Sequence, residues 1–153
     1  MKLVFLFSLC LYLSRPIHSQ DLNLIIQVNN ELITDGISGV YLKIGSTESS
    51  EQHFVSYFPG RLKIDSSLWK EIVSDTSKKV TLYFDYATFD KNHQLTANFF
   101  ADFKWYHFKQ PYLILNIYDF RDKKYKHWYK WLTEKEFLAE FRYPNGPVYI
   151  RQR

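Results

Sequence analysis

Short segments of alternating apolar and polar residues recur about every ten residues along this chain, and turn-forming residues separate them. A repeat of two is typical of half-buried β-strands, whereas amphipathic helices repeat every 3.6 residues. We expect strands over residues 22–28, 40–44, 53–58, 62–64, 80–89, 94–106 and 113–120. About seven short strands at this spacing predict an all-β fold, an antiparallel β-sandwich.

Three further segments complete the expected fold. Residues 66–74 have a helical pattern and predict one short helix. Thr133 and Glu136 could form a capping box for a helix over 134–142, but residues 137–143 also alternate as a strand does. We favour the strand. Residues 148–150 predict a short edge strand near the end of the chain.

The chain begins with an apolar run of about eleven residues, 3–13, behind the single cation of Lys2. This run is too short to span a bilayer, and the polar segment that follows it favours cleavage after Ser19. We therefore interpret residues 1–19 as a signal peptide. Residues 20–153 would form a single secreted, extracellular β-sandwich domain.

Cys10 is the one cysteine of the chain and lies within the predicted signal peptide. The secreted domain would therefore be free of disulfides and would depend on apolar burial, on self-association, or on both. Aromatic residues make up 19% of the chain and supply the apolar surface. Without residues 1–19, 18 basic residues face 16 acidic ones, and this balance does not indicate a general binder of polyanions.

The sequence carries no pattern of a common catalytic or cofactor site. It lacks G-x-S-x-G, histidine spacings typical of zinc sites and glycine-rich phosphate loops, so we predict a protein that is not an enzyme and needs no metal or cofactor. An enzyme with a spatially assembled site stays a further hypothesis. It would require a concave pocket lined by several of His53, Asp85, Asp90, His93 and Asp119.

Aromatic and basic residues interleave in two segments, 104–109 and 121–131, which flank the expected strand 113–120. At about 3.3 Å per residue the two segments would lie about 25 Å apart, at opposite ends of the strand. The second segment is the better candidate binding surface, with these residues as the site: Arg121, Lys123, Lys124, Lys126, Trp128, Lys130 and Trp131. The alternative is that Tyr125, Trp128 and Trp131 pack inward while the lysines form a solvated rim.

The order of segments in the second half of the chain resembles that of the transthyretin-like secreted proteins of nematodes. The resemblance is carried by strand 80–89, a turn through Thr88-Phe89-Asp90-Lys91-Asn92, the return strand 95–103 and the segment Pro111 to Tyr118. It implies a transthyretin or immunoglobulin-like β-sandwich without catalytic activity. It also implies a family in which bridging to exposed phosphatidylserine has been described.

Two hypotheses about function follow. In the first, the protein is a secreted, non-enzymatic binding module that recognises anionic lipid headgroups, glycans or a protein partner through segment 121–131. In the second, it is a structural or self-associating extracellular protein that forms a homodimer through an aromatic sheet face. Export argues against nucleic acid as a partner.

Overall fold

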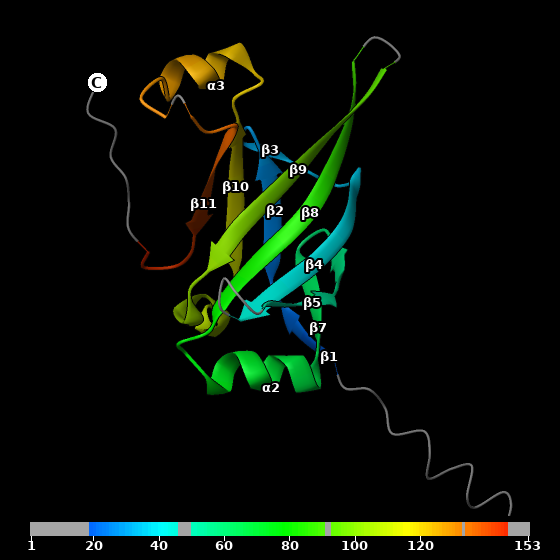
Figure 1. Cartoon of the computed structure of the whole chain (residues 1–153), viewed down its shortest axis with the longest axis vertical. Helices are drawn as coiled ribbons and strands as arrows, with labels where there is room; N and C mark the ends of the chain where they lie inside the picture. The colour runs from blue at the N-terminus through cyan, green and yellow to red at the C-terminus, as the bar shows by residue number, and fades with distance from the viewer. Residues whose placement is uncertain (1–18, 46–49, 91–92, 133, 147–153) are drawn as a thin grey trace, which may run out of the picture.

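The computed structural model describes residues 19–45, 50–90, 93–132 and 134–146, and strands make up most of them. Two four-stranded sheets face each other, with strand orders β5-β4-β8-β9 and β11-β10-β2-β3 (Figure 1). Their strands are β5 (Ser50–Phe54), β4 (Ile37–Gly45), β8 (Lys79–Asp90), β9 (His93–Phe103), β11 (Phe137–Arg142), β10 (Leu113–Asp119), β2 (Leu24–Val28) and β3 (Glu31–Leu32). The all-β, sandwich-like prediction is confirmed.

A third, smaller sheet lies at one end of the sandwich, with the order β1-β7-β6. Its strands are β1 (Ser19–Leu22), β7 (Arg61–Asp65) and β6 (Ser56–Phe58). The described pairings are antiparallel except that of β2 with β10, which run parallel. This parallel pair joins segments almost ninety residues apart, from Leu24 with Leu113 to Val28 with Ile117. The antiparallel sandwich that the sequence predicts thus includes one parallel pair.

The main core fills the space between the two large sheets. Alternate side chains of β2 point inward, and Leu24, Ile26 and Val28 are buried there. The facing strand β8 contributes Val80, Leu82 and Phe84 to the same core, as its alternating sequence predicts. These apolar layers hold the sandwich together, because burial of apolar surface is the dominant favourable contribution to folding.

Two expected strands are each interrupted by one residue. Segment 22–28 breaks at Asn23, whose carbonyl accepts a hydrogen bond from Leu113 N (2.8 Å) and whose side chain donates to Pro111 O (2.8 Å). The break sends β1 and β2 into different sheets. Segment 53–58 breaks at Val55, whose N–H donates to Val40 O (3.2 Å), so β5 and β6 also separate.

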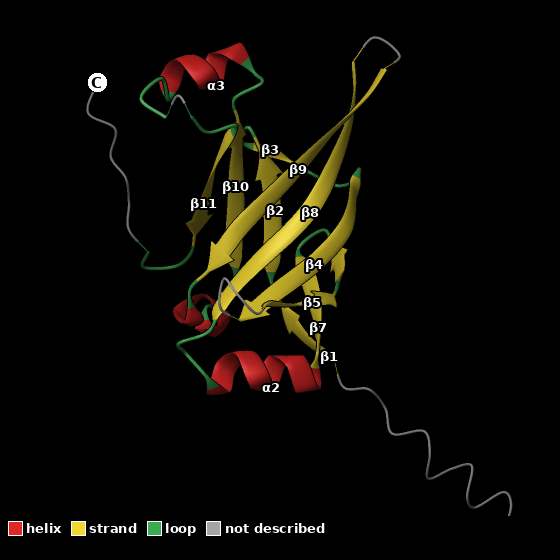
Figure 2. Cartoon of the chain, viewed as in Figure 1, coloured by secondary structure: helices red, strands yellow, loops and turns green. Residues whose placement is uncertain are grey.

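Among the described residues, three short helices lie at the two ends of the sandwich (Figure 2). The α-helix α2 (Ser66–Ser74) has the bounds that its sequence predicts, and it begins where the Asp65 side chain accepts from Ser67 N (2.8 Å). The 3-10 helix η1 (Trp105–Lys109) ends the expected strand 94–106 at Phe103, because His107 Nδ1 accepts from the backbone N–H of Lys104 (3.1 Å). The third, α3 (Lys123–Trp128), was not expected.

The ambiguous segment near the end of the chain is strand β11, as favoured above. The signal peptide apart from Ser19, the turn residues 91–92 and the expected strand 148–150 lie outside the described residues. Among the helices that are described, none is both long enough and apolar enough to cross a bilayer.

Candidate functional site

The helix α3 lies at one end of the sandwich, beyond the end of β10 (Figure 1). It begins at Asp122, whose side chain accepts from Lys124 N (2.8 Å), and this cap satisfies one of the free backbone donors of the first turn. It ends where Tyr129 N donates to Tyr125 O (3.0 Å). Six residues are too few for a stable isolated helix, so tertiary contacts must hold it.

Tyr125 supplies the main anchor of α3. Its side chain is buried, and its hydroxyl donates to Asn29 O (2.6 Å) and accepts from Asn30 Nδ2 (3.2 Å). Both asparagines have positive φ values, 56° and 67°, which Asn tolerates better than most residues. The fully buried Asn116 completes the network by donating to Asn30 Oδ1 (2.6 Å). The turn between β2 and β3 therefore fixes α3 on the sandwich.

A second apolar cluster lies beneath α3, separate from the main core. Tyr118, Phe120 and Tyr125 are its buried members, and the partly buried side chains packed on them are Trp128, Tyr129, Leu132 and Leu138. Burial, reinforced by the nearby Glu140 carboxylate, raises the pKa of Tyr118 to about 12, so this ring stays neutral at physiological pH. The cluster gives α3 a rigid base.

Arg121 differs from the other cations of the segment because a carboxylate holds it. Its Nε donates to both oxygens of the buried Asp119, at 3.0 and 2.8 Å, and its Nη1 donates to Thr96 O at 3.5 Å. The hydrogen bonds to Asp119 raise the pKa of the guanidinium. The structure thus gives Arg121 a positioning role between β10 and β9.

The lysines of the segment face solvent. Lys124 lies over the rings of Trp128 and Tyr125, with its Nζ 5.0 and 5.4 Å from their centres. Lys123, Lys126 and Lys130 are exposed, and no ion pair engages them within the described part of the chain. Trp131 exposes 66% of its surface. We name as the α3 surface the five residues Lys123, Lys124, Lys126, Lys130 and Trp131.

The sequence-predicted site is therefore divided by the structure. Its four lysines and Trp131 are gathered at one end of the molecule and face outward, whereas Trp128 is half-buried in the cluster beneath α3. The inward-packing alternative holds for Tyr125, holds in part for Trp128 and fails for Trp131. The sequence analysis did not predict the hydrogen-bond network of Asn29, Asn30 and Asn116 with Tyr125. An Asn-Asn pair at the end of a strand is nevertheless a signal for left-handed backbone.

Segment 104–109, the other aromatic and basic cluster, lies at the opposite end of β10, beside α2. His107 and Phe108 are buried there, and Phe108 packs on Trp69 of α2 with ring centres 5.8 Å apart. Burial, with a smaller contribution from Lys104, lowers the pKa of His107 to about 4. Lys109 lies 4.4 Å from the ring centre of Trp105. The prediction that the two clusters flank one strand is confirmed.

The residues of the enzyme hypothesis are spread over four strands, with Asp85 and Asp90 on β8 and His93 on β9. His53 lies on β5 and lines a cavity of about 330 Å³ with Asp65 and Ser67, and in that cavity Asp65 caps α2. Asp85 lies on β8, and Asp119 on β10 is paired with Arg121. Within the described residues, no group of three His, Cys, Asp or Glu residues is arranged to hold a metal ion.

An aromatic row crosses the outer face of the β5-β4-β8-β9 sheet. Phe54, Tyr41, Tyr83 and Phe100 are successive cross-strand neighbours, one from each strand. The Tyr41 and Tyr83 rings stack with centres 4.9 Å apart, and Phe100 follows at 5.7 Å from Tyr83. The outer members, Phe54 and Phe100, expose 77% and 48% of their surface.

No protein-family model, no curated protein and no solved structure matches this chain.

Proposed function

We propose that this protein is a secreted, non-enzymatic binding module whose α3 surface binds anionic lipid headgroups. The observation that carries the proposal is the outward placement of four lysines and Trp131 around a helix fixed from below by Tyr125. Lysines attract an anionic membrane by about 1 kcal/mol each, and an indole ring suits the interface between headgroups and acyl chains. The resemblance to the nematode transthyretin-like family supports the same choice of ligand.

The rigid base of the α3 surface adds to this argument. Binding through a preformed surface avoids the entropy cost of ordering a loop, so most of the attraction can contribute to affinity. Lys124 is held over Trp128 and Tyr125, which limits the motion of its ammonium group before binding. The expected ligand is a surface with several negative charges, since one phosphate could not engage four lysines.

Vesicle binding tests the proposal. The protein is titrated with phosphatidylcholine vesicles with and without phosphatidylserine, from low to high salt. We expect binding that requires phosphatidylserine and weakens as salt screens the charges. Changing Lys123, Lys124 and Lys126 to Glu should weaken binding by about 100-fold or more, from the loss of about 1 kcal/mol per lysine.

The matched control carries the same change of charge at the other end of the molecule. In the control, the exposed residues Lys70, Lys104 and Lys109 are changed to Glu together. The loss of binding free energy in this variant should be less than half of the loss in the α3 variant. Equal losses in both variants would mean a response to net charge alone and would contradict a site at the α3 surface. Unchanged binding in the α3 variant would also contradict it.

A second function is favoured by the aromatic row. We propose as the alternative that the outer face of the β5-β4-β8-β9 sheet forms a homodimer interface, with Phe54 and Phe100 as exposed apolar contacts. Sedimentation at micromolar concentration should then show a dimer that becomes monomeric when both residues are changed to Ser. A monomer in the unchanged protein would remove this function.

A further inference from the structure

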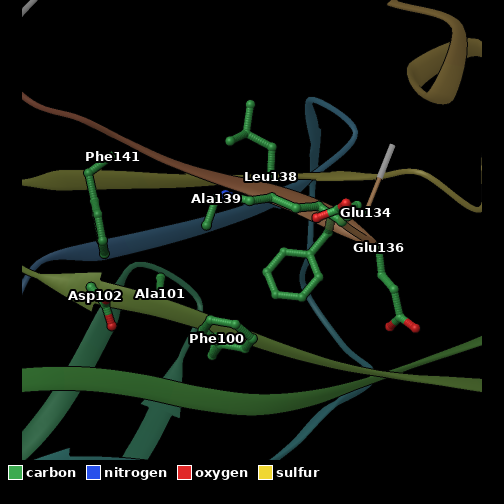
Figure 3. A pocket seen from close by; sticks show the side chains of 10 residues that line it. Phe100, Ala101, Asp102, Glu134, Glu136, Leu138, Ala139 and Phe141 are labelled. Carbon is green, nitrogen blue, oxygen red and sulfur yellow. The ribbon is translucent and has the colours of Figure 1, made fainter. Parts of the chain in front are cut away.

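A groove opens along one side of the sandwich, between the last strands of the two large sheets (Figure 3). β9 ends one sheet and β11 ends the other, and a cavity of about 600 Å³ lies between them. Rings of the two strands meet here, with Phe137 centred 5.1 Å from both Phe99 and Phe100. The α3 surface contributes no side chain to this groove.

The free edge of β11 faces the groove. Phe120 N donates to Glu136 O (2.9 Å), so the backbone groups of Glu136 point toward the β10 side. In the antiparallel register of β10 with β11, the same holds for Leu138, Glu140 and Arg142. Because backbone direction alternates along a strand, the N–H and C=O groups of Phe137, Ala139 and Phe141 point to the other side. No strand in the described part of the chain pairs with that side.

The free edge of β9 faces the same groove. The contact of Arg121 Nη1 with Thr96 O places Thr96 on the outer side of β9. By the same alternation, the backbone groups of Asn98, Phe100 and Asp102 lie on that side. Phe100 and Asp102 line the groove opposite β11. Two strand edges with which no described strand pairs therefore border one cavity.

Charge is distributed unevenly along the groove. Glu134 and Glu136 lie at one end, whereas Asp102 and Phe141 lie toward the other (Figure 3). Asp102 is already paired with Lys79 (3.0 Å) and accepts from Thr81 (2.7 Å). Glu134 and Glu136 are exposed and enter no ion pair in the described residues, and Lys135 is the lone cation among the lining residues. The glutamate end is thus net acidic.

From these features we infer that the groove binds an extended peptide segment of a partner protein, which pairs as an added strand with β11. Its backbone would hydrogen-bond to Phe137, Ala139 and Phe141, and its alternate apolar side chains would fill the cavity beside Phe100. A Lys or Arg of the segment would lie at the end marked by Glu134 and Glu136, where it finds opposite charge. This site is separate from the α3 surface and would give the protein a second partner.

The test begins with a displayed library of seven-residue peptides, selected on the purified protein. We expect enrichment of peptides with apolar residues at alternate positions and Lys or Arg at one end. Failure to enrich any such peptide over the starting library would overturn the proposal.

The best selected peptide is then made with N-methyl groups on alternate amides, which removes its strand hydrogen bonds and leaves its side chains. Binding should weaken more than about tenfold when the methylated amides are those that face β11. In hydrogen exchange, the unmodified peptide should slow the amides of Phe137, Ala139 and Phe141. Equal binding of the methylated peptide, or unchanged exchange at these amides, would contradict strand addition.

Charge variants locate the cationic end. Changing Glu134 and Glu136 to Gln should weaken binding about fivefold, whereas the same change at the exposed Glu31 and Glu51, outside the groove, should have no effect. Two other occupants are distinguished by the same assay. Peptide affinity that rises tenfold on removal of residues 147–153, or a dimer that the peptide dissociates, would assign the groove to the chain itself and overturn the proposal.

Discussion

Segments 104–109 and 121–131 place similar side chains at opposite ends of β10, yet they relate differently to the core. In the first, Phe108 and His107 are buried and join the rings of β9, β11 and α2. In the second, Tyr125 joins a small separate cluster, while the lysines and Trp131 face solvent. Composition alone therefore does not distinguish an aromatic core cap from an aromatic surface.

The difference follows from where each segment meets the sandwich. η1 follows β9 directly and lies beside α2 and β11, where Phe108 packs into the main core and His107 is buried against Phe141. α3 extends beyond the end of β10, where the sheets no longer face each other, and a single tyrosine secures it through hydrogen bonds. We expect the first segment to govern stability and the second to govern binding.

The largest expected effect is that of Phe108→Ala. Its ring contacts Phe103 and Trp69, with centres 4.9 and 5.8 Å away, so the change leaves a cavity in the main core. We expect a loss of about 3–5 kcal/mol in the free energy of unfolding, measured with urea. Trp131→Ala is the comparison. It should change the free energy of unfolding by less than about 0.5 kcal/mol, because this ring is 66% exposed. A larger loss of stability in Trp131→Ala would contradict the expectation that segment 121–131 governs binding rather than stability.

The next effect depends on pH and on His107. Burial lowers the pKa of this imidazole from 6.5 to about 4, so between these values the unfolded chain binds the extra proton and the folded chain does not. Stability is therefore complete above about pH 6.5 and falls as pH decreases to about 4, by up to about 3 kcal/mol. In His107→Asn, this fall of the free energy of unfolding with decreasing pH should disappear over the same pH range. His127→Asn, at an exposed histidine of α3, should retain this fall.

Tyr125→Phe should have a smaller effect, at the other end of the molecule. The change keeps the ring but removes the hydroxyl that bonds Asn29 O and Asn30 Nδ2, at a cost of about 1–2 kcal/mol. Hydrogen exchange should also accelerate in α3, while η1 stays unchanged. Tyr112→Phe, at an exposed tyrosine, is the control and should have no effect on either measurement. Normal exchange in α3 of Tyr125→Phe would mean that the hydroxyl is not its anchor.

The smallest expected effect is that of Lys124→Ala. Loss of the cation–π contacts with Trp128 and Tyr125 should lower the free energy of unfolding by about 0.5 kcal/mol. Lys126→Ala, which has no such contact in the described structure, should leave stability unchanged. Both variants should lose vesicle binding to a similar degree. A loss of stability in Lys126→Ala would mean that this side chain also makes a stabilising contact, which contradicts its place on a free surface.

Local pattern was enough to predict much of the fold. Alternation identified the strand of Val80, Leu82 and Phe84, and periodicity identified α2 with its buried Leu68 and Ile72. The parallel pairing of β2 with β10 could not be predicted, because it joins distant segments that no turn connects.

The candidate site was predictable to a similar extent. Exposure of the lysines follows from their charge, but α3 itself depends on Tyr125 reaching a turn 96 residues earlier in the chain. The groove between β9 and β11 could be predicted from the sequence even less than the position of α3. It exists because the last strands of two different sheets end on the same side of the sandwich, which is a property of the assembled fold.

The central claim is that the α3 surface contacts an anionic membrane, and the fluorescence of Trp131 tests it most directly. The emission of this indole is isolated as the difference between the unchanged protein and Trp131→Phe, with phosphatidylserine vesicles present and absent. We predict that the difference spectrum shifts to shorter wavelength with the vesicles and returns at high salt, because the exposed ring enters the interface. A difference spectrum that the vesicles leave unchanged, while the protein is bound to them, would contradict the claim.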